Sequence, residues 1–127
     1  MTLAATDLYT AISKTELDGY AQTLVESGQA DPVDTAIAEA LAVIKLYVDP
    51  FKLADGALAK LWKTLAVCWI YNRVGTIPVK REKEEQWAIE TLKDIRDGLH
   101  KNLIIDDTIE PAQKSNYGGP AFVKITL

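Results

Sequence analysis

The chain has 127 residues, of which 48% are hydrophobic and 25% are charged, and its formal net charge is −4 at pH 7. This length and composition predict one soluble globular domain with a single core, and they exclude wholesale disorder. The acidic balance, with no stretch dense in Lys and Arg, argues against a nucleic-acid-binding domain.

The first helical signals are short and amphipathic. Thr6 is the expected cap of a short opening helix in which Leu8 and Ile12 lie four residues apart on one face. Thr15 is the expected cap of a second helix, which Gly28 should terminate.

A long helix is predicted over residues 32–48. Asp31 supplies a capping side chain, Pro32 suits the first helical position, and Asp34 adds an acid to the first turn. Alanines beside the apolar stripe would let another helix approach closely, so Ala36, Ala40 and Val43 are predicted to contribute to an oligomer interface, together with the distant Trp87.

Two further helices are predicted over residues 55–74 and 80–97. The first is almost entirely apolar in its second half and should be surrounded by other elements, whereas the second is charged and amphipathic, with Ala88, Leu92, Ile95 and Leu99 as its buried stripe. The predicted core of the three long helices consists of Ile37, Leu41, Ile44, Leu61, Leu65, Trp69, Leu92 and Ile95.

The pattern changes after Asn102. Residues 103–120 contain turn formers and no helical period, whereas residues 121–127 alternate as a strand does. Since one strand cannot pair with itself, we expect it to dock on another chain or on another segment, with residues 103–105 as the partner within this chain. The docking tail comprises Tyr117, Gly118, Gly119, Phe122, Val123, Ile125 and Leu127.

Few residues suggest chemistry. Cys68 is the only cysteine and lies in the most apolar segment, so it should be an inert buried thiol. His100 is the only histidine, at a helix end, and has no second His or Cys with which to share a metal. Asp106 and Asp107 lack the surrounding pattern of a calcium loop. We therefore expect no catalytic residues, no metal and no cofactor.

The three tryptophans lie on helical stripes. Trp62 and Trp69 are expected in the core, because aromatic residues at helical spacing usually fill one. Trp87 adjoins a polar run and is equally compatible with a core position or an exposed anchor.

The order of these signals resembles a known family. The segments ADPVD, AEALAVIKLYV, LWKTLAVCWIYNRVG and LKDIRDGLHKNL follow one another as in the phage head-tail connector or neck adaptor proteins, which include the Mu-like prophage neck group. The resemblance covers roughly residues 6–103.

The resemblance implies a non-enzymatic ring subunit between the portal protein and the tail-completion protein, with DNA only passing through the channel. It also implies assembly in the host bacterial cytoplasm and a final place in the virion neck. No signal peptide or membrane span is apparent in the sequence. The predicted fold is mainly α, a small bundle of about four to five helices (residues 1–102) with an extended C-terminal tail (residues 103–127) ending in a short β-strand.

Three alternatives remain. A monomeric or dimeric cytoplasmic adaptor or regulatory domain would keep the same helices. A helix-turn-helix DNA binder would need an exposed recognition helix, but Lys60, Lys63 and Arg73 are scattered among core residues. An enzyme would need a carboxylate site that forms only in three dimensions.

Overall fold

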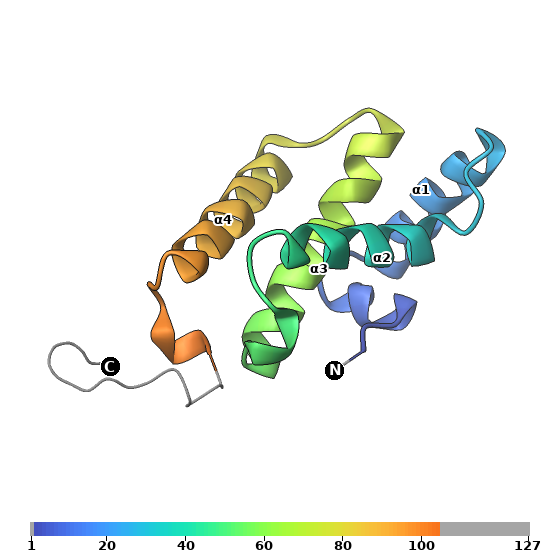
Figure 1. The fold of residues 1–127 in the computed structure, drawn as a ribbon. Coiled ribbons are helices and arrows are strands. Elements are labelled where there is room, and N and C mark those ends of the chain that lie inside the picture. Colours follow the sequence, from blue (N-terminus) through green and yellow to red (C-terminus); the bar gives the residue numbers. More distant parts are fainter. Residues whose placement is uncertain (1, 105–127) are drawn as a thin grey trace, which may run out of the picture.

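A computed structural model describes residues 2–104, which form a mainly helical bundle (Figure 1). Its elements are η1 (Ala5–Thr10), α1 (Lys14–Glu26), α2 (Pro32–Lys45), η2 (Pro50–Lys52), α3 (Asp55–Val74), α4 (Val79–Arg96) and η3 (Lys101–Leu103). Within these residues the only β pairing is one isolated antiparallel bridge, between Leu53 and Ile104. The predicted helical bundle is confirmed. None of its helices is long and apolar enough to cross a bilayer.

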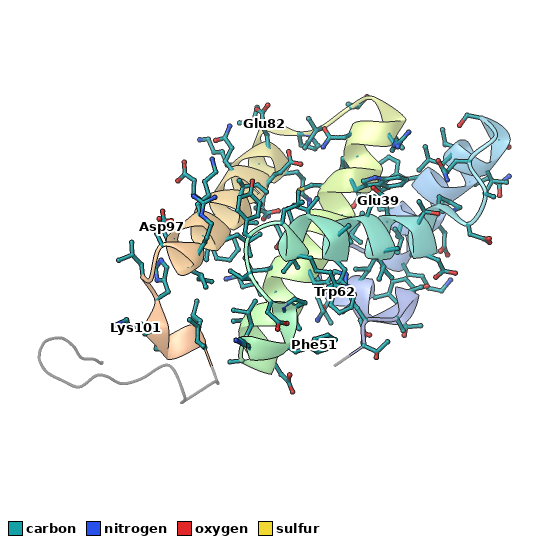
Figure 2. The ribbon with its side chains drawn as sticks, viewed as in Figure 1. Glu39, Phe51, Trp62, Glu82, Asp97 and Lys101 are labelled. Carbon is teal, nitrogen blue, oxygen red and sulfur yellow. The ribbon has the colours of Figure 1, made fainter. Side chains whose placement is uncertain are left out.

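The core is built around α3, which runs through the middle of the molecule with α2 across it and α4 at one side (Figure 1). Leu61, Ala66 and Ile70 of α3 are buried, as the nearly continuous apolar sequence of this helix predicts. The indole Nε1–H of Trp62 donates to the backbone oxygen of Ile37 at 2.8 Å, and this buried bond joins α3 to α2 (Figure 2). α3 therefore positions both of the other long helices.

Most of the predicted core is confirmed. Leu41 and Trp69 are only partly buried and pack at its edge. Leu99, predicted on the buried stripe of α4, is 56% exposed, because Gly98 adopts φ 95° and the chain leaves the helical direction before residue 99. The buried members of the predicted set are Ile37, Ile44, Leu61, Leu65, Leu92 and Ile95.

The predicted caps are partly wrong. Ser13, not Thr15, precedes α1, and its Oγ accepts from the backbone N–H of Glu16 at 3.2 Å. Thr6 lies inside η1, where the Asp7 carboxylate instead accepts from the backbone N–H of Ala4. Asp31 does occupy the N-cap position of α2, but at φ 44° its side chain makes no capping bond. Its carboxylate is exposed.

The predicted oligomer interface on α2 needs correction. Ala36 and Ala40 are 0% and 2% exposed, because they lie on the side of α2 that packs into the core, where α3 is its main neighbour. They belong to the core of this chain and are not available to a partner. Val43 is half-buried against the same core. Of the four predicted interface residues, only Trp87 has a largely accessible side chain, which is 42% exposed.

The end of the described chain returns to the start of α3. The backbone N–H of Ala54 donates to the oxygen of Leu103 at 2.7 Å, beside the Leu53–Ile104 bridge. Leu103 and Ile104 pack against the core, so they belong with the helical unit rather than with a separate tail. The predicted docking tail, its terminal strand and Asp106 and Asp107 lie outside the described residues.

Candidate functional site

A groove lies between α3, the first half of α4 and the end of η1, with a volume of about 1100 Å³. Its lining includes the small residues Gly56 and Ala59 of α3. Five basic side chains line it against one carboxylate, that of Glu84. We call it the basic groove, after Lys60, Lys63, Lys80, Arg81 and Lys83.

Arg81 fixes one wall of the basic groove. Its Nη2 donates to the backbone oxygen of Ala11 at 2.9 Å, and its Nη1 forms an ion pair with Glu84 at 3.1 Å. Its guanidinium also lies 5.5 Å from the centre of the Tyr71 ring. Arg81 therefore ties the start of α4 to both the end of η1 and α3, which makes it a positioning residue.

The Tyr71 side chain, which contacts Arg81, extends the network of polar side chains to α1. The Tyr71 hydroxyl donates to Glu16 at 2.8 Å, and the Tyr20 ring meets the Tyr71 ring edge to face at 5.0 Å. Burial, together with this hydrogen bond to a carboxylate, raises the pKa of Tyr71 to about 12. Although burial opposes the charge on Arg81, its interactions with Tyr71 and Glu84 raise the pKa of Arg81. Both shifts keep Tyr71 neutral and Arg81 positively charged at neutral pH.

The other basic side chains are more open. The Lys60 Nζ lies 4.9 Å from the centre of the Trp87 ring, and the Lys63 Nζ donates to the Thr10 hydroxyl at 2.9 Å. Lys80 and Lys83 are exposed, and no carboxylate between residues 2 and 104 forms an ion pair with either. The groove thus combines uncompensated positive charge with an accessible aromatic ring.

A second accessible surface lies on the connection between α2 and α3. Leu46 and Phe51 are 77% and 70% exposed, and both line a shallow hollow together with Tyr47, Val48 and Pro50. Large apolar side chains gathered in this way on a folded surface are typical of contact sites. We call it the connection patch.

Cys68 and His100, the residues with the most reactive side chains, have no neighbours in the described part of the chain that would make them catalytic or metal-binding groups. Burial raises the pKa of Cys68 to about 12, with Glu85 and Glu84 adding to the effect, and its Sγ–H donates to the backbone oxygen of Arg81. His100 is exposed near the end of α4, with its Nε2 3.5 Å from Asp94. Across residues 2–104, no three His, Cys, Asp or Glu side chains gather as metal ligands do.

Sequence reasoning found Trp87 but not the groove around it. In the sequence, Lys60 and Lys63 are scattered among core residues, and Lys80 and Lys83 belong to a predicted helix with charges of both signs. The three-residue spacing within each pair places its lysines on one helix face, which was the available signal. The sequence does not specify how α3 and α4 cross, and that crossing brings the two pairs together.

Comparisons with known proteins add no relative: no protein-family model, curated protein or solved structure matches the chain.

Proposed function

We propose that this chain is a structural virion protein, a head-tail connector subunit that forms a ring between the portal and the tail. The observation that carries this proposal is the presence, on one small helical unit, of two different surfaces that each expose large apolar side chains. Trp87 and Val79 lie at the basic groove, and Leu46 and Phe51 lie on the connection patch.

The two surfaces matter because of ring geometry. A closed ring of identical subunits uses head-to-tail contacts, so each copy must present two non-equivalent patches. A subunit that also bridges two other proteins needs further accessible apolar area. The basic groove and the connection patch differ in residues and in charge, as contacts with different neighbours require.

The partners in this proposal are further copies of the chain, the portal protein and the tail-completion protein. The sequence-predicted docking tail, which includes Tyr117, Phe122 and Ile125, would pair as a strand with one of them. Removal of residues 118–127 should leave the melting temperature unchanged and abolish assembly with that partner. Loss of fold stability with assembly retained would contradict the docking role.

Co-assembly tests the function. The full chain is mixed with portal protein and heads produced from the same genome, and the complexes are examined by native mass spectrometry and electron microscopy. A ring of this chain on the portal is expected, and failure to co-assemble would refute the proposal. A free protein that stays monomeric or dimeric and binds one other protein would instead support an adaptor function.

A matched pair of variants tests the connection patch. Phe51→Ala removes an exposed ring of the patch, whereas Leu99→Ala removes a similarly exposed side chain elsewhere. Both should change the free energy of unfolding by less than about 0.5 kcal/mol, since neither side chain is in the core. Only Phe51→Ala should weaken co-assembly. Equal behaviour of the two variants would exclude the patch from the contact.

A further inference from the structure

The charges of this chain are separated along its length. Between Thr15 and Ile44 there is no Lys, Arg or His, whereas six acidic residues occur there, at positions 16, 18, 26, 31, 34 and 39. The basic groove, by contrast, has five basic side chains and one carboxylate. A net charge of −4 therefore conceals an acidic region and a basic one.

The acidic region is concentrated at the turn from α1 to α2. Glu26 is the last residue of α1, Asp31 precedes α2, and Asp34 lies in its first turn. All three are exposed, and no basic residue of the described chain forms an ion pair with any of them. Val25, beside Glu26, is 51% exposed and gives the turn an apolar side chain. We call this surface the acidic turn.

The two surfaces lie far apart on one molecule. Figure 1 shows the α1–α2 turn and α4 at opposite ends of the bundle. One copy cannot insert its own acidic turn into its own groove without unfolding, whereas a second copy can present it. Complementary patches at opposite ends generate head-to-tail association, the type of contact that closes rings.

We propose that the basic groove of one copy binds the acidic turn of the next copy. The contact would place the carboxylates of Glu26, Asp31 and Asp34 near Lys80 and Lys83, with Val25 meeting the Trp87 ring. An aromatic anchor surrounded by paired charges is the common composition of a protein interface. This inference rests on the proposed ring and specifies which surfaces form its subunit contact.

Two other occupants of the groove are chemically reasonable. One is the acidic stretch Asp106, Asp107 and Glu110 of the same chain, which begins just after the Leu53–Ile104 bridge. The other is the phosphate backbone of a nucleic acid, which basic grooves attract. The acidic turn is favoured because it combines three exposed carboxylates with an apolar side chain to match Trp87.

Charge-exchange variants of the full chain provide the test. The groove variant carries Lys80→Glu and Lys83→Glu, and the early position of both residues in α4 makes acids favourable for the helix dipole. The turn variant carries Glu26→Lys, Asp31→Asn and Asp34→Asn. Lysine suits the C-terminal end of α1, and asparagine tolerates the positive φ at position 31.

Self-association is measured by sedimentation velocity over a concentration series, at low and high ionic strength. The wild-type chain should associate at low salt and dissociate as the salt screens charge beyond about 10 Å. Each variant alone should associate about tenfold more weakly or worse. The groove variant places acids opposite the acidic turn, and the turn variant removes three carboxylates and places one lysine opposite the basic groove. A mixture of the two variants, or one chain carrying both sets, should recover association.

A matched control separates the effect of the groove charges from the effect of the net charge of the chain. Lys14→Glu with Lys93→Glu changes the net charge as much as the groove variant does, at exposed positions outside both the basic groove and the connection patch. It should leave association intact. Far-UV circular dichroism verifies that each variant is folded.

Several outcomes would overturn the inference. These are a wild-type chain that stays monomeric throughout, a control as damaging as the groove variant, or a mixture that does not recover association. If neutralising Asp106, Asp107 and Glu110 weakens self-association and the turn variant does not, that segment is the occupant of the groove. If the wild-type chain also binds a short DNA duplex, only the groove variant loses that binding, and the turn variant associates as the wild type does, the groove is a phosphate site. Co-assembly with the portal remains a separate readout, so the ring proposal can survive failure of this contact.

Discussion

Replacing Arg81 with Met should destabilise the fold by about 2 to 3 kcal/mol, although Arg81 lies near the surface. Its side chain is 18% exposed and donates from Nη2 to the Ala11 oxygen at 2.9 Å. A hydrogen bond from a charged donor contributes roughly 1.5 to 3 kcal/mol. The contact with the Tyr71 ring adds about 0.5 to 1 kcal/mol, and the ion pair with the half-exposed Glu84 adds at most about 0.5 kcal/mol. We take the lower part of the summed range because Met retains the packing of the aliphatic stem and water can reach Ala11.

Urea unfolding followed by circular dichroism measures this loss. Lys80→Met is the matched control, because position 80 is exposed, adjacent in sequence and in the same helix, and Met, Lys and Arg have similar helix propensities. The control should lie within about 0.5 kcal/mol of the wild type. Arg81→Lys should lose an intermediate amount, since one ammonium cannot replace the two-armed guanidinium. Equal stability of Arg81→Met and Lys80→Met would refute the view that Arg81 clamps α4 to η1.

Three further predictions concern the core. Leu65→Ala should reduce the free energy of unfolding in urea by about 2 to 5 kcal/mol, and a loss below about 0.5 kcal/mol would show that Leu65 is not central. Trp62→Phe should cost about 2 kcal/mol in the same assay by removing the donor to Ile37 and leaving a small void, whereas Trp87→Phe should be nearly neutral. Because the pKa of Cys68 is raised from 9.0 to about 12, the unfolded thiol ionises first as pH rises. The free energy of unfolding should therefore fall as the pH rises from about 9 to about 12, and the urea midpoint should fall with it. Cys68→Ala should make this pH dependence of the urea midpoint shallower. An unchanged pH dependence would contradict a buried thiol at position 68.

The sequence predicted the long helices well because their signals are local. A mainly apolar segment between Asp55 and Gly75, with no Gly or Pro after its first turn, defines α3, and Gly75 ends it at φ 95°. The sequence predicts that α2 ends at residue 48, three residues beyond its last residue, Lys45. Leu46 and Val48 continue the apolar spacing, although the backbone already turns there. Periodicity therefore located helices better than it located their ends.

The faces of those helices were harder to predict. Ala36 and Ala40 are small enough for either a core or a surface, and only the position of α3 decides that they are buried. Ser13 and Thr15 are both favourable cap residues, and Ser is the stronger of the two. The structure uses Ser13, which directly precedes Lys14, the first residue of α1. The basic groove requires the crossing of two helices, which no local pattern encodes.

The bridge between Leu53 and Ile104 has a mechanical consequence. It fastens the chain after α4 to the residues that introduce α3, with the 2.7 Å bond from the N–H of Ala54 to the oxygen of Leu103 beside it. Tension applied to the chain beyond residue 104 would therefore reach the bundle at the start of its central helix. The C-terminal turn of α4, which ends at Arg96, would bear none of that load until this fastening broke. If a partner pulls on the C-terminal residues during assembly, the force would act on the start of α3, and α4 would not unwind from its end while the bridge holds.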